Sequence, residues 1–122
     1  MHARLIIAAL ALAALSAASQ AQAQASPGET LFKQQCGTCH TIAPGAPKMG
    51  PPLKGVVGRK AGTLAGFAYS PALKASGVTW SADSLDKYLA KPMAFVPGTK
   101  MMVGLPDATK RAAVVAYLVA QK

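Results

Sequence analysis

The sequence predicts a small all-α domain behind a cleavable leader. Three observations favour this fold class: helix-capping residues recur along the chain, apolar residues recur at helical spacing, and no stretch alternates polar and apolar residues as a half-buried strand does. The 97 residues after position 25 amount to one domain near the lower end of the usual size range. We expect about four to five helices and long loops.

Residues 1–25 have the anatomy of a secretory signal peptide. A basic start at Arg4 precedes an apolar run over 5–15, and a stretch of small residues and glutamines closes in an A-x-A pattern. This run is shorter than the roughly 20 residues that cross a bilayer, and no later run is long enough to span. We therefore expect cleavage after Ala25, with Ala23 as the neighbouring choice, and a periplasmic protein without a membrane span. An uncleaved anchor is the alternative.

The domain, residues 26–122, begins with a helix-start signal. Ser26 can cap the helix, Pro27 suits its first position, and Glu29 stands where it would complete a capping box. This helix should end at residues 36–40. Residues 41–69 carry many glycines and prolines and predict a loop with little regular structure. A loop of that length is uncommon unless it has a task, such as wrapping a cofactor.

Further helices are predicted after this loop. A short one spans 70–77, with Ser70 as its cap and Gly77 past its end. Ser81 can cap the next, which Pro92 should end. Residues 96–102 form another loop, and Asp107 caps the last helix. The apolar face of that last helix comprises Val114, Tyr117 and Leu118.

Both cysteines of the chain lie in Cys36-Gly37-Thr38-Cys39-His40. C-x-x-C-H is the attachment signature of a c-type haem. Thiols three positions apart lie on one side of a helical turn, from which both can form thioether bonds to the two vinyl groups of a porphyrin. The imidazole of the adjacent His40 can then bind the iron.

Other uses of a cysteine pair fit the chain less well. A zinc site needs two further Cys or His ligands, and besides His40 the chain has only His2. A thioredoxin-like pair expects a βαβ setting, and none is predicted. A thiol–disulfide oxidoreductase and a structural disulfide are the alternatives to haem attachment.

An iron held by His40 either takes a sixth ligand or leaves a position open. An open position would suit a peroxidase or a ligand-binding haem protein, whereas a thioether sulfur raises the reduction potential and suits electron transfer. The methionines after the leader are Met49, Met93, Met101 and Met102. Core packing is the common role of methionine. We favour Met101 as ligand, because Pro97-Gly98 stiffens and turns the loop just before it.

The domain is strongly basic. Ten Lys and two Arg against four acidic residues give residues 26–122 a formal net charge of +8. Export argues against a nucleic-acid partner, and the lysines stand singly rather than in a run. We expect a solvated basic face that steers acidic protein partners, with a purely solubilising surface as the alternative.

Several blocks resemble a known family. The chain is similar to class I cytochromes c, close to the mitochondrial type and its soluble bacterial counterparts, from about Gly28 to Leu118. The blocks that carry the resemblance are 36–40, Gly50-Pro51-Pro52-Leu53, Gly58-Arg59-Lys60-Ala61-Gly62, Gly66-Phe67-Ala68-Tyr69-Ser70, Val78-Thr79-Trp80, Tyr88-Leu89, Pro97-Gly98-Thr99-Lys100-Met101 and Ala116-Tyr117-Leu118. The block ending at Met101 is far more restrictive than C-x-x-C-H, which many haem proteins share.

The resemblance implies the small class I cytochrome c fold around one covalently bound haem c. Cys36 and Cys39 would hold the haem, with His40 and Met101 as axial ligands. The remaining implied contacts are Pro51, whose carbonyl bonds the proximal histidine, Tyr88, whose hydroxyl approaches the axial sulfur, and Arg59, Tyr69, Trp80 and Thr99 around the propionates.

Three residues depart from the family pattern. Leu73 stands where an asparagine near a propionate is common, and Val103 where a large aromatic follows the axial methionine. Met93 stands where a docking lysine is common. None removes a ligand, and all three bear on the potential and on partner preference.

The function that the resemblance implies is electron transfer and not enzymatic catalysis. The iron would give and take single electrons while the protein sets its potential. The protein would be a monomer whose Lys48, Lys60 and Lys100 surround the exposed haem edge and draw in acidic faces of redox partners. Implied donors are a quinol-oxidising complex or a dehydrogenase, and implied acceptors are a terminal oxidase or a reaction centre. Such complexes are small and transient.

Overall fold

Five helices and long loops make up residues 24–45 and 47–122, which the structure, a computed structural model, describes. The helices are α1 (Pro27–Gln35), α2 (Pro71–Ala75), α3 (Ala82–Ala90), α4 (Pro92–Phe95) and α5 (Ala108–Ala120). Within these residues there is no strand, only an isolated antiparallel bridge between Lys60 and Thr79. The all-α prediction is confirmed.

The predicted signal peptide lies outside the described residues, except for its last two positions. Among the helices that are described, none combines the length and apolarity that a bilayer crossing requires.

Local sequence signals set where the helices begin. At four helix starts a capping side chain accepts a hydrogen bond from the backbone N–H three residues on; these caps are Ser26, Ser70, Ser81 and Asp107. The capping box is complete at α3, where the Ser84 hydroxyl also accepts from the Ser81 N–H at 2.8 Å. The box predicted for α1 is half formed, because the Glu29 carboxylate pairs with Lys33 at 2.7 Å instead.

Pro92 ends one helix and begins the next. The sequence predicts only the ending: α3 stops at Ala90, as a proline without an N–H donor requires. Pro92 is also the first residue of α4, where its fixed φ suits a first turn. A four-residue helix has too few positions to show an apolar period, so the sequence carries no sign of α4.

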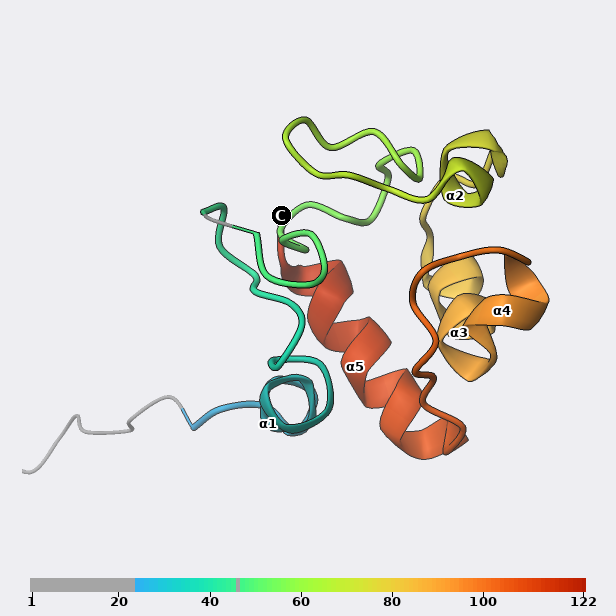
Figure 1. The fold of residues 1–122 in the computed structure, drawn as a ribbon. Helices are drawn as coiled ribbons and strands as arrows, with labels where there is room; N and C mark the ends of the chain where they lie inside the picture. The colour runs from blue at the N-terminus through green and yellow to red at the C-terminus, as the bar shows by residue number, and fades with distance from the viewer. Residues whose placement is uncertain (1–23, 46) are drawn as a thin grey trace, which may run out of the picture.

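Helices α1 and α3 both pack on α5, the long helix that crosses the middle of the view in Figure 1. Gly28 is buried there, and a Cβ at this position would lie 2.8 Å from the Cβ of Tyr117. One turn later the Phe32 ring lies 5.5 Å from the Tyr117 ring. Val114, on the same face of α5, has no exposed surface. A small and a large residue on α1 thus let the two helices cross closely.

In the loop over 41–69, the described residues (41–45 and 47–69) form no helix, as predicted, and backbone hydrogen bonds tie them to the rest of the chain. The Gly55 N–H donates to the Gln121 carbonyl beyond α5 at 2.7 Å, which brings the chain end to the loop. Gly58 donates to the Trp80 carbonyl at 2.7 Å and Trp80 donates to the Arg59 carbonyl at 2.9 Å. In Figure 1 the loop, teal to green, passes to the left of and above α5 and ends beside α2.

Candidate functional site

A cavity of about 600 Å³ lies between this loop, the helices and the 97–105 segment. Apolar side chains such as Leu53, Val56, Leu85 and Leu89 form much of its wall. Its size and its mainly apolar lining are those of a ligand or cofactor site. All ten site residues predicted from the sequence line it: Cys36, Cys39, His40, Pro51, Arg59, Tyr69, Trp80, Tyr88, Thr99 and Met101.

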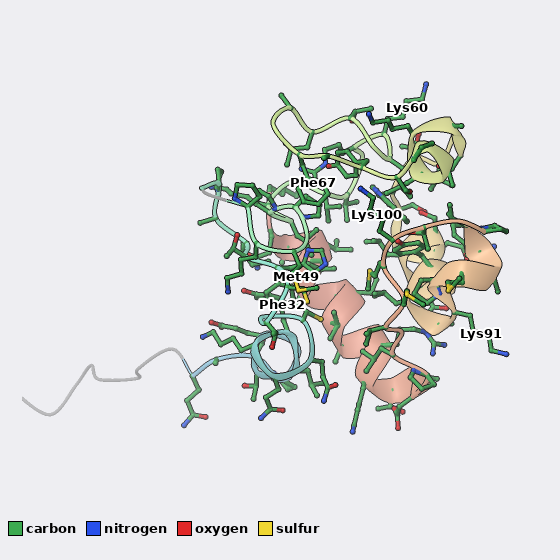
Figure 2. All side chains as sticks on the ribbon, in the orientation of Figure 1. Phe32, Met49, Lys60, Phe67, Lys91 and Lys100 are labelled. Atoms are coloured by element: carbon green, nitrogen blue, oxygen red, sulfur yellow. The ribbon has the colours of Figure 1, made fainter. Side chains whose placement is uncertain are left out.

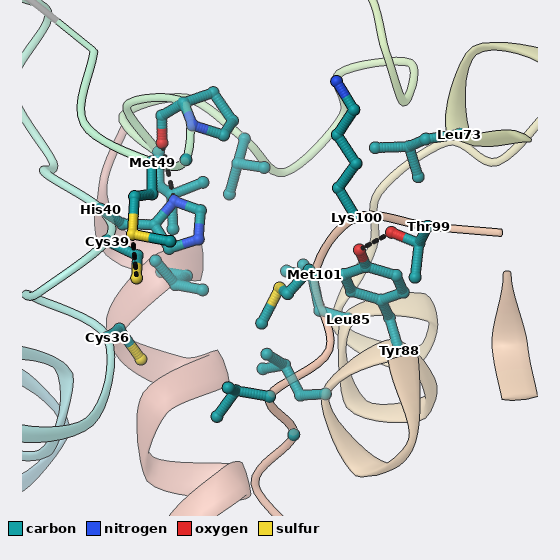
Figure 3. A pocket seen from close by; sticks show the side chains of 18 of the residues that line it. Cys36, Cys39, His40, Met49, Leu73, Leu85, Tyr88, Thr99, Lys100 and Met101 are labelled. Carbon is teal, nitrogen blue, oxygen red and sulfur yellow. Dashed lines mark hydrogen bonds between the residues drawn. The ribbon is translucent and has the colours of Figure 1, made fainter. Parts of the chain in front are cut away.

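The two cysteines and His40 reach the cavity from one tight turn. Cys36 caps the end of α1, and its carbonyl accepts from the N–H groups of Cys39 and His40 at 3.1 and 2.9 Å. Figure 3 shows both sulfurs and the imidazole along the same wall. The cysteines are separate thiols. Burial raises the pKa of the Cys36 thiol, opposite to the lowered pKa of a reactive nucleophile, so the thiol–disulfide alternative gains no support.

His40 is held in one tautomer and one orientation. Its Nδ1 lies 2.8 Å from the Pro51 carbonyl oxygen. A carbonyl only accepts, so Nδ1 carries the hydrogen and the Nε2 lone pair is left for a metal. Burial lowers the pKa of His40, although the bond to Pro51 opposes this, and the neutral ring that results is the form that binds metals.

Gly50 lets the backbone lie directly against the imidazole of His40. A Cβ at position 50 would come within 2.7 Å of Nδ1 and 2.8 Å of Nε2. The Gly50 N–H also donates to the Cys39 carbonyl at 2.8 Å. The residue therefore positions the ring, a role that sequence analysis assigned only to Pro51. Its place directly before Pro51 is the signal that could have revealed it.

Met101 is the methionine that faces His40 from the opposite wall (Figure 3). It is partly buried and packs against the core. The other three differ in placement. Met102 is 73% exposed, and Met93 is exposed and does not line the cavity. Met49 is 82% exposed and lies on the His40 side, with its Sδ 4.0 Å from the Cys39 Sγ.

Polar side chains also line the cavity. The Arg59 guanidinium donates to the carbonyls of Pro52 and Lys54 at 3.2 and 3.4 Å. The Trp80 and Tyr88 rings pack with their centroids 5.0 Å apart. Two further polar residues line the cavity: Tyr69, whose ring meets Phe67 edge-on at 4.8 Å, and Thr99, which is buried.

The Tyr88 and Thr99 hydroxyl oxygens are 2.6 Å apart. The resemblance assigns them to different atoms of the cofactor, whereas the structure joins them to each other. One hydrogen serves this bond, and the second remains for another acceptor. Burial raises the pKa of Tyr88, and the bond from Thr99 opposes this only partly, so the phenol stays protonated.

The mouth of the cavity is apolar, with lysines beside it. Met49, Met102 and Val103 all line the cavity and are all exposed. Lys48 donates to the Gly37 carbonyl at 2.8 Å, next to the attachment turn. Lys100 lines the cavity, but Figure 2 shows Lys60 on the outer side of its loop, away from both Met49 and Lys100. Of the three lysines expected around the cofactor edge, only Lys100 lines the cavity, and the place of Lys60 around that edge stays a prediction.

The side chains around the cavity fit a haem. They combine two thiols three positions apart, an imidazole with a free Nε2 and a thioether across an apolar space. Leu73 lines the cavity where the family often has a polar residue, and this makes the wall more apolar without removing a ligand. Over 24–45 and 47–122 no cluster of three or more His, Cys, Asp or Glu side chains could hold a metal ion, so a zinc site has no support there.

Comparisons with known proteins agree with this geometry. A family model described as "Cytochrome c" matches residues 25–122. Cytochrome c2 of Rhodomicrobium vannielii is 50% identical over 108 residues, which cover 87% of this chain and 86% of that protein. Cytochrome c2 of Blastochloris viridis is 44% identical over 117 residues, which cover 94% and 91%. The solved structure of cytochrome cH from Methylobacterium extorquens matches with a TM-score of 0.69 and 45% identity, over 76% of this chain and 94% of that one.

Proposed function

The chain belongs to the cytochrome c family, and from this premise we propose that it carries single electrons in the periplasm through one His/Met-ligated haem c. Members of the family are electron carriers and not enzymes, and they bind haem covalently through cysteines. In this chain those cysteines are Cys36 and Cys39. The observation that carries the proposal is that the imidazole of His40 and the thioether of Met101 face each other across an apolar cavity with both cysteines at its edge.

When bound, the haem supplies a one-electron couple between Fe(III) and Fe(II). The residues of the chain hold the side chains that would bind the iron in fixed positions. Pro51 holds the His40 ring through Nδ1, and Gly50 lies against its face. Met101 comes from a loop packed on the core. Ligands that are held in place need little rearrangement when the charge changes, and an apolar wall adds few dipoles that would reorient.

The polar side chains that line the cavity supply donors for the carboxylates of a haem. Arg59 has five N–H groups, and the carbonyls of Pro52 and Lys54 occupy only some of them. We assign Arg59, Tyr69, Trp80 and Thr99 to the propionates. The spare hydrogen of the Tyr88–Thr99 pair serves either the nearer propionate or the axial sulfur.

The proposal also includes export with cleavage of the signal peptide, and docking on acidic redox partners. The family match begins at residue 25, beside the predicted cleavage point. The net charge of +8 over residues 26–122 supports an acidic partner surface, and the exposed Met49, Met102 and Val103 support an apolar centre to that contact. A quinol-oxidising complex or dehydrogenase as donor, and a terminal oxidase or reaction centre as acceptor, are partners of this kind for a monomeric carrier.

Intact mass and a visible spectrum test the proposal. The exported protein should have the mass of residues 26–122 plus one haem, and the haem should remain bound after acid–organic extraction. Extractable haem would overturn covalent attachment, and a mass that includes residues 1–25 would indicate an uncleaved anchor. The oxidised protein should be low-spin with a methionine-to-iron charge-transfer band, whereas a peroxidase-like protein with an open position would be high-spin and lack that band.

A further inference from the structure

We propose that Met49 is a modification site, where a peroxide oxidises the thioether to a sulfoxide beside the haem-attachment turn and thereby lowers the reduction potential. This inference rests on the proposed attachment of haem at Cys39. Met49 lines the cavity and is nonetheless 82% exposed, so its side chain lies at the mouth. Its Sδ lies 4.0 Å from the Cys39 Sγ, and Figure 3 shows the two sulfurs facing each other beside His40.

Two hydrogen bonds fix the chain on either side of Met49. The Lys48 ammonium donates to the Gly37 carbonyl at 2.8 Å, and the Gly50 N–H donates to the Cys39 carbonyl at 2.8 Å. Both acceptors belong to the attachment turn, so the backbone around Met49 is joined to that turn at both ends. It cannot withdraw from the turn without breaking one of these bonds, and the thioether is therefore kept at the surface next to the attachment point.

The other methionines of the described residues are placed differently. Met101 is partly buried against the core, and Met93 is 47% exposed but does not line the cavity. Met102 is 73% exposed at the mouth. Of the methionines described, however, Met49 alone makes a hydrogen-bond contact with a cysteine. Met49 thus combines the access that an oxidant needs with a position from which the change can act on the cofactor.

The reaction needs only a peroxide and is reversible. Hydrogen peroxide transfers one oxygen atom to the Met49 sulfur: the O–O bond breaks, an S–O bond forms, the sulfur loses two electrons, and the peroxide is reduced to water. Methionine sulfoxide reductase reverses this change with a thiol reductant. Two thiols are then oxidised to a disulfide, and the oxygen leaves as water.

The sulfoxide would place a polar, hydrated group at the edge of the cofactor. Burial and the local dielectric are among the factors that set the potential of a haem. A polar group next to the Cys39 sulfur favours the oxidised state, which carries the higher charge, so the potential should fall. The same change would weaken any apolar contact that a partner makes with Met49 at the mouth.

Limited treatment of the oxidised holoprotein with hydrogen peroxide, followed by peptide mapping, tests the site. The sulfoxide of Met49 should form about twofold faster than that of Met93, as the exposed fractions of 82% and 47% imply. Redox titration should then give a lower potential, which methionine sulfoxide reductase with a thiol reductant should restore. Met49→Leu should abolish the shift. Met102→Leu removes another exposed thioether at the mouth and should retain it.

Three results would overturn this role of Met49: oxidation no faster than that of Met93, an unchanged potential after its oxidation, or a shift that persists in Met49→Leu. Extractable haem, or an untreated protein without the methionine-to-iron band, would instead contradict the proposed function. In that case peptide mapping still decides whether peroxide oxidises Met49 in preference to Met93.

Discussion

The hydroxyl oxygens of Tyr88 and Thr99 lie 2.6 Å apart and join α3 to the loop that carries Met101. Both residues are buried, so the bond satisfies two groups that have little access to water. Because two hydroxyl groups hold two hydrogens and the bond uses one, one O–H hydrogen remains for a further acceptor, and both residues line the cavity. The pair therefore links the stability of this wall to the electrostatics of the site.

Tyr88→Phe should lower the reduction potential. The substitution removes one O–H dipole beside the cavity, and a dipole whose positive end points at the site favours the reduced, less positive state. The free energy of unfolding should fall by about 1 kcal/mol, since Thr99 loses its partner. Spectroelectrochemical titration and denaturant unfolding measure the two effects. Tyr117→Phe, outside the cavity, is the control, and an equal change in potential there would refute a specific role for Tyr88.

Gly50→Ala should disturb the proximal side while the covalent haem is retained. The new methyl group would overlap the His40 ring, so the imidazole or the backbone must shift, at a cost of about 1–3 kcal/mol of unfolding free energy. Thermal unfolding and the low-spin spectrum report this change. Gly45→Ala is the matched control, since a Cβ there meets nothing within 4 Å. Similar losses at both positions would show that general loop stiffness, not contact with His40, is responsible.

Met101→Ala should retain haem but lose the methionine-to-iron band and lower the reduction potential. A weaker or exchangeable donor would replace the thioether, and peroxidase activity should appear at the vacated position. Met102→Ala should do none of these, because its side chain is 73% exposed. Absorption spectra and redox titration of both variants measure the outcome. The reverse pattern would move the ligand by one residue.

Electron transfer to an acidic partner should slow as salt increases. The Debye length falls from about 30 Å at 0.01 M to about 10 Å at 0.1 M, which shortens the range of attraction, and charges at the rim act mainly on the association rate. Lys48→Glu, beside the cavity mouth, should slow association more than Lys122→Glu at the chain end. Stopped-flow kinetics over a salt series measures both. A rate independent of salt would instead indicate docking through apolar contacts such as Met49 and Val103.

Short sequence motifs, whose effect depends only on neighbouring residues, were enough to predict the helix starts and the haem-attachment turn. The caps at Ser26, Ser70, Ser81 and Asp107 act on amides three positions away, and they located the helix starts. C-x-x-C-H likewise places two thiols and an imidazole on one turn, which the structure retains. The family blocks added a set of residues that proved to line one cavity.

Only the tertiary structure decided how distant segments meet. The Lys100–Ala68 bond, the Tyr88–Thr99 pair and the contact of Gly50 with His40 join residues 10 to 32 positions apart, through loops without a periodic pattern. The outward turn of Lys60 and the exposure of Met49 have the same origin. The path of a loop depends on contacts between residues that are distant in the sequence. Helix capping and the spacing of the two cysteines depend only on residues that are close in the sequence. For this reason the sequence determined the haem-binding turn and the helices, and the fold determined which methionine faces the histidine.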